Sequence, residues 1–353
     1  MNKSISRLHV LSGLLIAVAL ILGSPAAGLA ENFYQGKAIR FVLGFSPGGG
    51  YDTYTRAIAR HFGKHVPGNP VIIVQNRTGA GSMITANYVS KKAKPDGLTV
   101  GIWSSDLVLR QALGQKGFQF DARKLNWIGT PTQDTPACAI MAFTGLRTLD
   151  DIMKLKEPLK LGSTGSGTTD GLPRILNNVL GPMFDIITGF RGSATIRLSL
   201  QKREVQAMCL TWESMRVTGR SMLDARGGDK LIPFIIHKKW DDPEVKNLPI
   251  ISEVIKGKDN LATYYAWVSV YEFFRPFSTP LGTPKDRVET LRRAFKATLE
   301  DPAFLAELKK ANLPSVYVSA EQIEKSVQRI YSMSPEVKEN LRFLVKGRER
   351  SRS

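Results

Sequence analysis

Three consecutive glycines follow an apolar run in the segment FVLGFSPGGGYD, residues 41–52. Glycine lets the backbone approach a ligand closely, because no side chain stands in the way. Pro47 fixes the turn, and Asp52 is placed to cap the helix that we expect next. A helix starting there offers unpaired N–H groups and the positive end of its dipole, which favour an anion. The alternative is a tight strand-to-helix turn without a ligand.

Three further loops share this small and hydroxyl-rich character. They are NRTGAGS (76–82), GSTGSGTTDG (162–171) and FRGSAT (190–195). Each alone is more often an ordinary turn than a ligand site. Together, their backbone amides and hydroxyls are suited to carboxylate or phosphate oxygens without a buried cation. We therefore expect the four loops to converge on one oxygen-rich ligand.

The elements that must position these loops alternate along the chain. Strand-like runs are expected at 38–45, 69–77, 98–105, 138–143 and 159–164, with helices such as 53–65 and 81–93 between them. This alternation predicts a doubly wound α/β architecture with mostly parallel sheets, in which ligands sit at loops leaving the strands. From residue 284 onward we expect three amphipathic helices, with Pro302 at a helix start and Ser319 as a cap.

The first thirty residues have the pattern of a secretory signal. Lys3 and Arg7 precede the apolar run 10–22, and small residues end at Ala30. The run is too short for a membrane anchor, and no cysteine follows it for lipid attachment. We expect cleavage after Ala30 and a soluble mature protein in the periplasm.

The charge balance is strongly basic, with 49 Lys and Arg against 31 Asp and Glu. The excess suits anionic partners, but the charges are dispersed, and we find no zinc-finger spacing, aromatic RNP-like run or basic helix. Nucleic acid is therefore not an expected partner. The terminal KGRERSRS is interpreted as a solvated tail. Cys138 and Cys209 are expected to be buried thiols, although an oxidising compartment permits one bridge.

An enzyme is the main competing class. His61 and His65 lie at helical spacing but lack the glutamate of an HExxH motif, so a surface pair is preferred to a zinc site. There is no GxSxG elbow, no Walker lysine and no third glycine of a dinucleotide fingerprint in GAGSMI. We expect no metal, no cofactor and no catalytic residue.

The segments IRFVLGFSPGGGYDTYTRAIARHF and VIIVQNRTGAGSMITANYVSKKAKPDGLTV resemble the opening of the TctC family, also called Bug receptors. The likeness continues through LGSTGSGTTDGLPRIL, FRGSATIRLSL, LPIISEV and STPLGTPKDRVETLRRAFKATLEDPAFLAEL. This resemblance implies a two-domain, type II periplasmic-binding-protein fold with the ligand cleft between the domains. It also implies a discontinuous domain 1 (31–132 and 256–353) and a domain 2 (133–255), with crossings near 131–137 and 255.

The resemblance also nominates residues that hold carboxylate oxygens. The glycines match the family's first-strand loop, the hydroxyls of 163–168 its second-domain loop, and residues 192–194 its KGSA motif. With the neighbouring polar positions, the expected ligand-binding residues are Pro47, Gly48, Gly49, Gly50, Asp52, Ser104, Ser163, Thr164, Ser166, Thr168, Asp170, Gly192, Ser193, Ala194 and Thr211.

Two departures bear on which ligand is bound. Asp170 stands where the family commonly has a small or neutral residue, and CLTWES (209–214) replaces a different polar stretch. We expect Asp170 to be a helix cap, the alternative being an amine-binding carboxylate. Trp212 is expected in the core, the alternative being stacking on a ligand. Trp103, at the end of a strand, could likewise lie in the core or stack on a ligand.

The function implied is a monomeric receptor that captures a small organic anion by cleft closure and delivers it to the membrane permease subunits of a tripartite tricarboxylate transporter. An exported sensor of the same fold, signalling to a membrane partner, is the alternative. An exported enzyme is the less favoured one.

Overall fold

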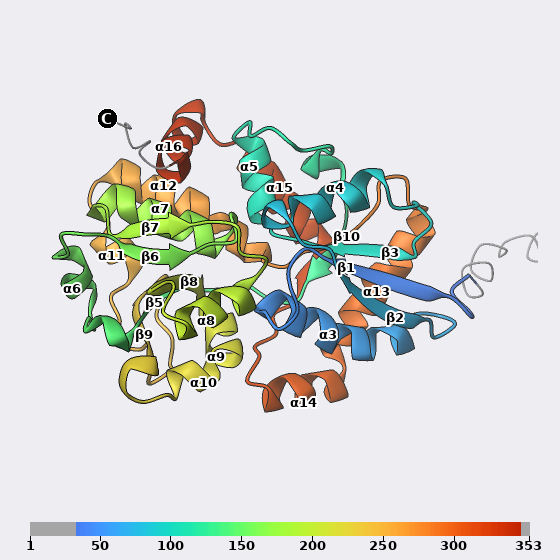
Figure 1. Ribbon diagram of the computed structural model, residues 1–353. Coiled ribbons are helices and arrows are strands. Elements are labelled where there is room, and N and C mark those ends of the chain that lie inside the picture. Colours follow the sequence, from blue (N-terminus) through green and yellow to red (C-terminus); the bar gives the residue numbers. More distant parts are fainter. Residues whose placement is uncertain (1–32, 347–353) are drawn as a thin grey trace, which may run out of the picture.

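The computed structural model describes residues 33–346 as two lobes, each built on one β-sheet with helices packed against it (Figure 1). The expected signal segment and residues 347–353 of the expected tail lie outside the described residues. The two sheets lie side by side, and helices α3, α8 and α9 meet where the lobes adjoin (Figure 1).

The first sheet has the strand order β11-β4-β10-β3-β1-β2. Its strands are β1 (Ala38–Leu43), β2 (Val71–Asn76), β3 (Thr99–Ile102), β4 (Asn126–Thr130), β10 (Phe277–Thr279) and β11 (Val318–Ser319). Strand β1 is parallel to both β2 and β3, whereas β10 and β11 pair antiparallel with their neighbours. Strand β1, which lies between β3 and β2, is apolar nearly throughout, as expected of a strand covered on both faces.

The second sheet has the order β7-β6-β8-β5-β9. Its strands are β5 (Pro136–Met141), β6 (Leu159–Gly162), β7 (Phe184–Ile187), β8 (Ala207–Thr211) and β9 (Leu231–Ile236). Strand β6 is parallel to β7 and β8, and β5 is antiparallel to β8 and β9.

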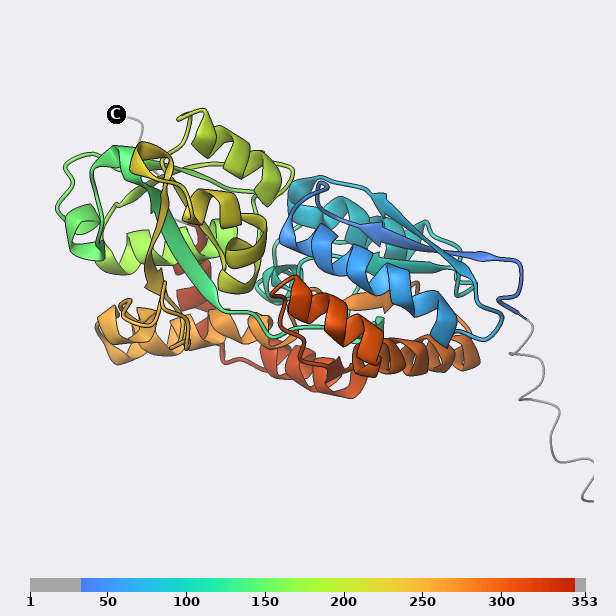
Figure 2. The same ribbon diagram turned by 90° about the horizontal axis from the view of Figure 1, so that it is seen from below.

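The predicted α/β class and two-lobed fold are confirmed, but the sheets are mixed rather than mostly parallel. Strands β5 and β10 each enter their sheet directly from the other lobe. Two neighbouring strands become parallel when a helix carries the chain from one strand back to the start of the next in the same sheet. Strands β5 and β10 are not reached by such a connection. The antiparallel pairings therefore follow from the two connections between the lobes (Figure 2).

The helices occupy most of the remaining chain. The α-helices are α3 (Gly50–Phe62), α4 (Met83–Lys91), α5 (Asp106–Ala112), α6 (Leu149–Met153), α7 (Thr168–Leu180), α8 (Ser193–Gln201), α9 (Trp212–Thr218), α10 (Arg220–Leu223), α11 (Ile251–Val254), α12 (Lys258–Val268), α13 (Lys285–Glu300), α14 (Pro302–Lys310), α15 (Ala320–Tyr331) and α16 (Pro335–Lys346). Short 3₁₀ turns are η1 (Gly63–His65), η2 (Ala80–Ser82), η3 (Ala122–Lys124), η4 (Ala142–Thr144), η5 (Gly227–Asp229) and η6 (Ser269–Phe273).

The three C-terminal helices predicted from sequence are confirmed as α13, α14 and α15. Pro302 begins α14, and Ser319 forms a capping box with Gln322 at the start of α15. Helix α16 was not predicted, and it packs against α12 and α7 of the second lobe. The C-terminal segment thus passes from one lobe to the other.

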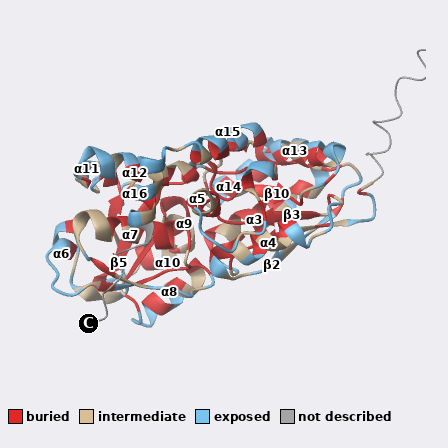
Figure 3. Cartoon of the chain, turned by 90° about the horizontal axis from the view of Figure 1, so that it is seen from above, coloured by how far each residue is buried: buried red, intermediate tan, exposed pale blue. Residues whose placement is uncertain are grey.

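Two connections join the sheets, at residues 131–135 between β4 and β5 and at 274–276 between η6 and β10. The division of the chain into domains stays a prediction, because the long segment 237–276 contains no strand of either sheet. Buried side chains continue across the junction as one core that includes Trp103, Trp127 and Leu161 (Figure 3).

Cys138 and Cys209 form a disulfide, so the expectation of two free thiols is wrong. The residues are register partners on the antiparallel pair β5 and β8. Directly opposite positions on neighbouring strands bring Cβ atoms within about 5 Å. Sequence alone cannot show this register, which decides whether the two sulfurs meet.

Candidate ligand-binding site

A cavity lies between the lobes at the ends of the predicted loops. It encloses about 40 Å³, which is room for roughly three water molecules. It is lined by Phe45, Gly49, Gly50, Tyr51, Ser104, Thr164, Ser166, Gly167, Thr168, Thr169, Ser193, Leu210, Ser214 and Phe274. None of these residues is Asp, Glu, His, Lys or Arg. Polar recognition here depends on backbone amides and hydroxyl groups.

A second and larger space adjoins this inner cavity. It measures about 320 Å³ and shares Phe45 and Thr164 with the inner cavity. Its wall includes Met83, Arg110 and Arg191. The two spaces together have the size of an ordinary small-molecule pocket, about 300–1,000 Å³.

The first glycine loop forms one wall of the inner cavity. Helix α3 begins at Gly50, three residues before the predicted start, and its N-cap Gly49 has no side-chain cap hydrogen bond. The prediction that Asp52 caps this helix is therefore wrong. The Asp52 carboxylate instead accepts from the Gly48 N–H at 3.0 Å and from Arg56 Nε at 2.9 Å. Although burial opposes ionisation, these hydrogen bonds hold the pKa of Asp52 below its usual value.

The second-domain loop forms the opposite wall. Helix α7 starts at Thr168 after Gly167, which has a positive φ of 59° and leaves the helix without a side-chain cap. Thr164, Ser166 and Thr168 line the cavity. Ser163 does not, because its hydroxyl donates to Asp170 Oδ1 at 3.1 Å.

The other two loops close the ring around the cavity. Ser193 lines it at the start of α8, whose N-cap Gly192 again lacks a side-chain cap. The Gly81 carbonyl of the 76–82 loop accepts from Ser166 Oγ at 2.9 Å. A Cβ at Gly48 would lie 3.7 Å from Ala194 Cβ. The structure thus brings all four predicted loops together, and their contact with a ligand stays a prediction.

Asp170 is neither a helix cap nor a free carboxylate. It accepts from Arg110 Nη2 at 2.8 Å and pairs with Arg174, four residues along α7. Burial alone would raise its pKa, but the two guanidinium groups hold the pKa of Asp170 below its usual value. The prediction of a cap is wrong, and a carboxylate already shared by two arginines is poorly placed to bind an amine.

Some predicted residues lie outside the inner cavity. Pro47 is exposed. Thr211 is buried and donates to Asp134 Oδ2 at 2.6 Å. Trp212 is fully buried in the core of the second lobe, which confirms the expected role. Trp103 is also in the core, whereas its neighbour Ser104 lines the cavity with a buried hydroxyl that has no hydrogen-bond partner among the described residues.

Sequence reasoning missed the apolar part of the wall. Phe45 and Tyr51 flank the glycine run, so proximity to that motif was a usable signal. Leu210 and Ser214 lie in CLTWES (209–214), the segment noted above as a departure from the family, whereas Phe274 comes from a distant segment that carries no motif. Only the fold brings them to the loops.

Direct contacts bridge the lobes on both sides of the cavity. On one side Arg110 of α5 bonds Asp170 of α7, and the Gly167 N–H donates to Asp106 Oδ2 at 3.1 Å. On the other side Arg197 Nη2 donates to the Gly48 carbonyl at 2.8 Å. The two lobes are therefore in direct contact on both sides of the cavity.

His61 and His65 do not form a joint site. His61 Nε2 lies 2.8 Å from Glu307 Oε2, and His65 Nε2 lies 2.9 Å from Asp301 Oδ2. Each histidine contacts a different carboxylate of the α14 region. Within residues 33–346, no cluster of His, Cys, Asp and Glu is arranged to hold a metal ion.

The two sheets, the cleft between them and the converging loops are those of a two-lobed solute-binding protein. Residues 55–340 match the family model described as the tripartite tricarboxylate transporter family receptor, TctC, so the chain belongs to this family and the predicted resemblance is confirmed. Among the helices of residues 33–346, none is both long and apolar enough to cross a bilayer.

Relatives match over most of the chain. The UPF0065 protein of the tcbD-tcbE intergenic region of Pseudomonas sp. (strain P51) is 26% identical over 317 residues, 88% of this chain and 87% of its own. A structure from R. palustris solved with adipate has a TM-score of 0.68 at 18% identity, covering 87% of this chain and 97% of its own. MatC of Rhodopseudomonas palustris, solved with bound malate, has a TM-score of 0.67 at 18% identity, covering 86% and 99%.

Proposed function

We propose that this protein is a periplasmic receptor that captures a small carboxylate between its lobes for a tripartite transporter. The observation that carries the proposal is the convergence of three helix N-termini on one cavity. Helices α3, α7 and α8 each begin at that cavity after a glycine that provides no side-chain cap. Their first N–H groups and dipoles create a site for negative charge.

The two adjoining spaces support one placement of such a ligand. One carboxylate group enters the inner cavity, where the hydroxyls of Ser104 and Ser193 supplement the helix amides. The body of the ligand extends into the larger adjoining space. There Arg110 and Arg191 line the wall and favour a second anionic or polar group. The adipate and malate bound by related structures support this ligand class.

The residues named for binding share the property of lining or supporting this cleft. Those that line the inner cavity are Gly49, Gly50, Ser104, Thr164, Ser166, Thr168 and Ser193. The remaining ones act through loop shape or lobe contacts, as Gly48 does by accepting from Arg197.

The proposal also includes the cellular location of the protein, its oligomeric state and the absence of catalysis. The signal pattern of residues 1–30, cut after Ala30, and the Cys138–Cys209 disulfide support export to an oxidising compartment. The protein acts as a monomer, hands its ligand to membrane permease subunits and catalyses no reaction. A sensor of the same fold remains the second candidate, distinguished by a neighbouring gene for a sensor kinase in place of a permease.

A melting screen tests the proposal. The mature protein is heated with di- and tricarboxylates, aromatic acids and acidic amino acids, with malate and adipate included. A ligand at one hundred times its Kd adds about 2.7 kcal/mol to the free energy of unfolding, which is visible as a higher Tm. Ligand recovered chemically unchanged supports a receptor. The absence of any shift from the whole panel contradicts the proposal.

A further inference from the structure

A buried arginine lies directly beneath the inner cavity, at the junction of the two lobe connections. Arg275 belongs to connection 274–276, and its side chain is 1% exposed. Its Nη1 donates to Thr132 Oγ1 at 3.0 Å and to Asp134 Oδ2 at 2.5 Å, both in connection 131–135. One guanidinium therefore ties together the two segments that join the lobes.

Aromatic rings enclose this guanidinium. Its central carbon lies 5.3 Å from the Tyr51 ring centre, 4.6 Å from that of Tyr54 and 4.9 Å from that of Phe274. Tyr51 and Phe274 also line the cavity. These cation–π contacts help to hold the guanidinium in place, and the Asp134 carboxylate balances its charge.

The second nitrogen of the fork reaches the cavity wall. Arg275 Nη2 donates to Ser214 Oγ at 2.5 Å, and Ser214 lines the inner cavity. The backbone of Gly50 lies just above this pair. A Cβ at Gly50 would be 2.0 Å from Ser214 Oγ and 3.1 Å from Arg275 Nη2.

The hydrogen bonds around Ser214 show whether its hydroxyl proton is available to a ligand. A hydroxyl has one proton to donate. Thr211 donates its hydroxyl proton to Asp134 Oδ2, which lies 2.6 Å away. Thr211 Oγ1 lies 3.2 Å from Ser214 Oγ, and it can therefore accept a hydrogen bond from Ser214. Because Arg275 donates to Ser214, the Ser214 proton remains available. It points to Thr211 Oγ1 or to an acceptor in the cavity.

We infer that Ser214 is a ligand-binding donor and that Arg275 is the positioning residue that orients its hydroxyl toward the bound anion. The inference rests on the proposed function and adds one ligand contact with its support to the same site. The arginine strengthens the hydroxyl as a donor, because a hydrogen bond accepted from a cation polarises the acceptor's own O–H group. A guanidinium that is ion-paired with Asp134 thus acts on the ligand through one serine, without a direct ion pair to the ligand.

Calorimetric titration with malate and adipate tests this inference. Three variants are compared with wild type: Ser214→Ala, Arg275→Met and the double substitution. Removing one hydroxyl donor to a charged ligand weakens binding about tenfold or more. We expect Ser214→Ala to show this loss, Arg275→Met to show at least as much, and Arg275→Met to have little further effect once Ser214 is alanine. Arg275→Lys, which keeps the charge, should retain part of the affinity.

A matched control separates binding from folding. Ser278→Ala also removes a buried serine hydroxyl, one that accepts from Trp103 Nε1 and does not line the cavity. It should lower Tm while leaving the Kd of malate and adipate unchanged.

The outcomes are distinct. If wild type binds a carboxylate and Ser214→Ala binds it equally well, the inference is overturned and the proposed function stands. If the losses from Ser214→Ala and Arg275→Met simply add, Arg275 does not act through Ser214 and its assignment is overturned. If wild type binds neither malate nor adipate nor any other acid of the screen, the proposed function and this inference fall together. Ser214→Ala alone decides the serine assignment if the arginine variants do not fold.

Discussion

Gly49 and Ser193 face each other across the cleft, so closely that a Cβ at Gly49 would lie 2.8 Å from Ser193 Oγ. Gly49 has φ −93°, a conformation open to any residue, so the glycine is required by the close approach and not by backbone geometry. A side chain at this position would press on the Ser193 hydroxyl, so the small size of Gly49 eases the approach of the two lobes.

Replacing Gly49 by Val therefore tests the closed site. A β-branched side chain there meets Ser193 and keeps the lobes apart, while the backbone of the first lobe accepts the change. We expect loss of carboxylate binding with little loss of Tm, measured by calorimetric titration and thermal unfolding. A fall in Tm as large as the fall in affinity would show instead that the glycine loop is a structural turn.

The sequence predicted most successfully that this loop and the three other glycine- and hydroxyl-rich loops would come together. The glycine and hydroxyl segments are local, and a strand followed by a helix places their loops at one edge of a sheet. The hydrogen-bond partners of single side chains in these loops were harder to predict. Asp52 looked like a cap, but the helix begins earlier, so its carboxylate turns back to the Gly48 N–H and to Arg56.

The ion pair between Arg110 and Asp170 gives a second prediction. It joins α5 of the first lobe to α7 of the second, with side chains 13% and 4% exposed. Asp170→Asn leaves Arg110 without its partner across the cleft, so the closed state should lose about 1–3 kcal/mol. We expect a lower Tm and a carboxylate affinity reduced about fivefold or more in the same titration.

The exposed pair of Arg220 and Asp224 provides the control. Like Arg174 and Asp170, the two residues are four apart within one lobe, but Asp224 is 62% exposed, whereas Asp170 is buried and also pairs with Arg110 across the cleft. Asp224→Asn should leave both Tm and affinity nearly unchanged. Equal affinity losses in Asp170→Asn and Asp224→Asn would contradict a role of the cross-lobe pair.

The buried side chain of Glu213 should make the stability of the folded protein depend on pH in an unusual direction. Burial, together with the charge of Asp134, raises its pKa from 4.5 to about 8. The folded protein then binds more protons than the unfolded chain between these values, so stability falls as pH rises through this interval. Between pH 6.5 and 8 the slope should approach about 1.4 kcal/mol per unit at most.

Denaturant unfolding at several pH values measures this slope. Glu213→Gln keeps an acceptor for the Thr135 N–H, which lies 2.8 Å from Glu213 Oε2, and has no proton to exchange. The comparison starts at pH 6.5 because His237, whose pKa burial lowers to about 4, opposes the effect of Glu213 at more acid pH. If wild type and Glu213→Gln have the same slope from pH 6.5 to 8, the raised pKa of Glu213 is contradicted.

The disulfide supplies a stability prediction that is separate from binding. Cys138 and Cys209 are 71 residues apart in sequence, and neither lines the inner cavity. Replacing both by Ala removes a constraint on the unfolded chain and should cost about 2–5 kcal/mol. We expect a lower Tm with an unchanged Kd. An affinity loss at temperatures where the variant is fully folded would show that the bridge also shapes the cleft.

What sequence reasoning could not reach depends on contacts between distant segments. Phe274 joins the cavity from a connection between the lobes, and Arg110 of the first lobe meets Asp170 of the second. The disulfide depends on strand register, which no local pattern encodes. Helix α16 returns to the second lobe, although its neighbours in sequence cover the first.

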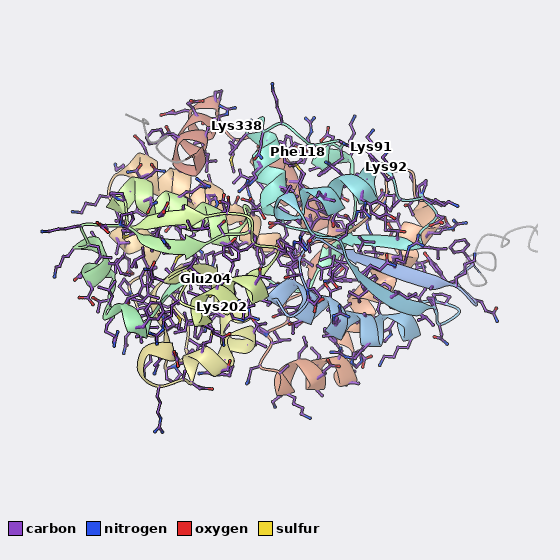
Figure 4. All side chains as sticks on the ribbon, in the orientation of Figure 1. Lys91, Lys92, Phe118, Lys202, Glu204 and Lys338 are labelled. Carbon is purple, nitrogen blue, oxygen red and sulfur yellow. A yellow bond between two sulfur atoms is a disulfide. The ribbon has the colours of Figure 1, made fainter. Side chains whose placement is uncertain are left out.

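Distance measurement between the lobes tests the central claim most directly. Lys91 ends α4 of the first lobe and Lys202 follows α8 of the second, and both are exposed (Figure 4). Spin labels on Lys91→Cys and Lys202→Cys, with the buried Cys138–Cys209 bridge left intact, report the separation of the lobes. A carboxylate that touches both walls stabilises the closed state over the open one. At saturating concentrations of the acid with the largest melting shift, we predict one short and narrow distance distribution, against a longer and broader one without it. An unchanged distribution at saturation would contradict capture by closure.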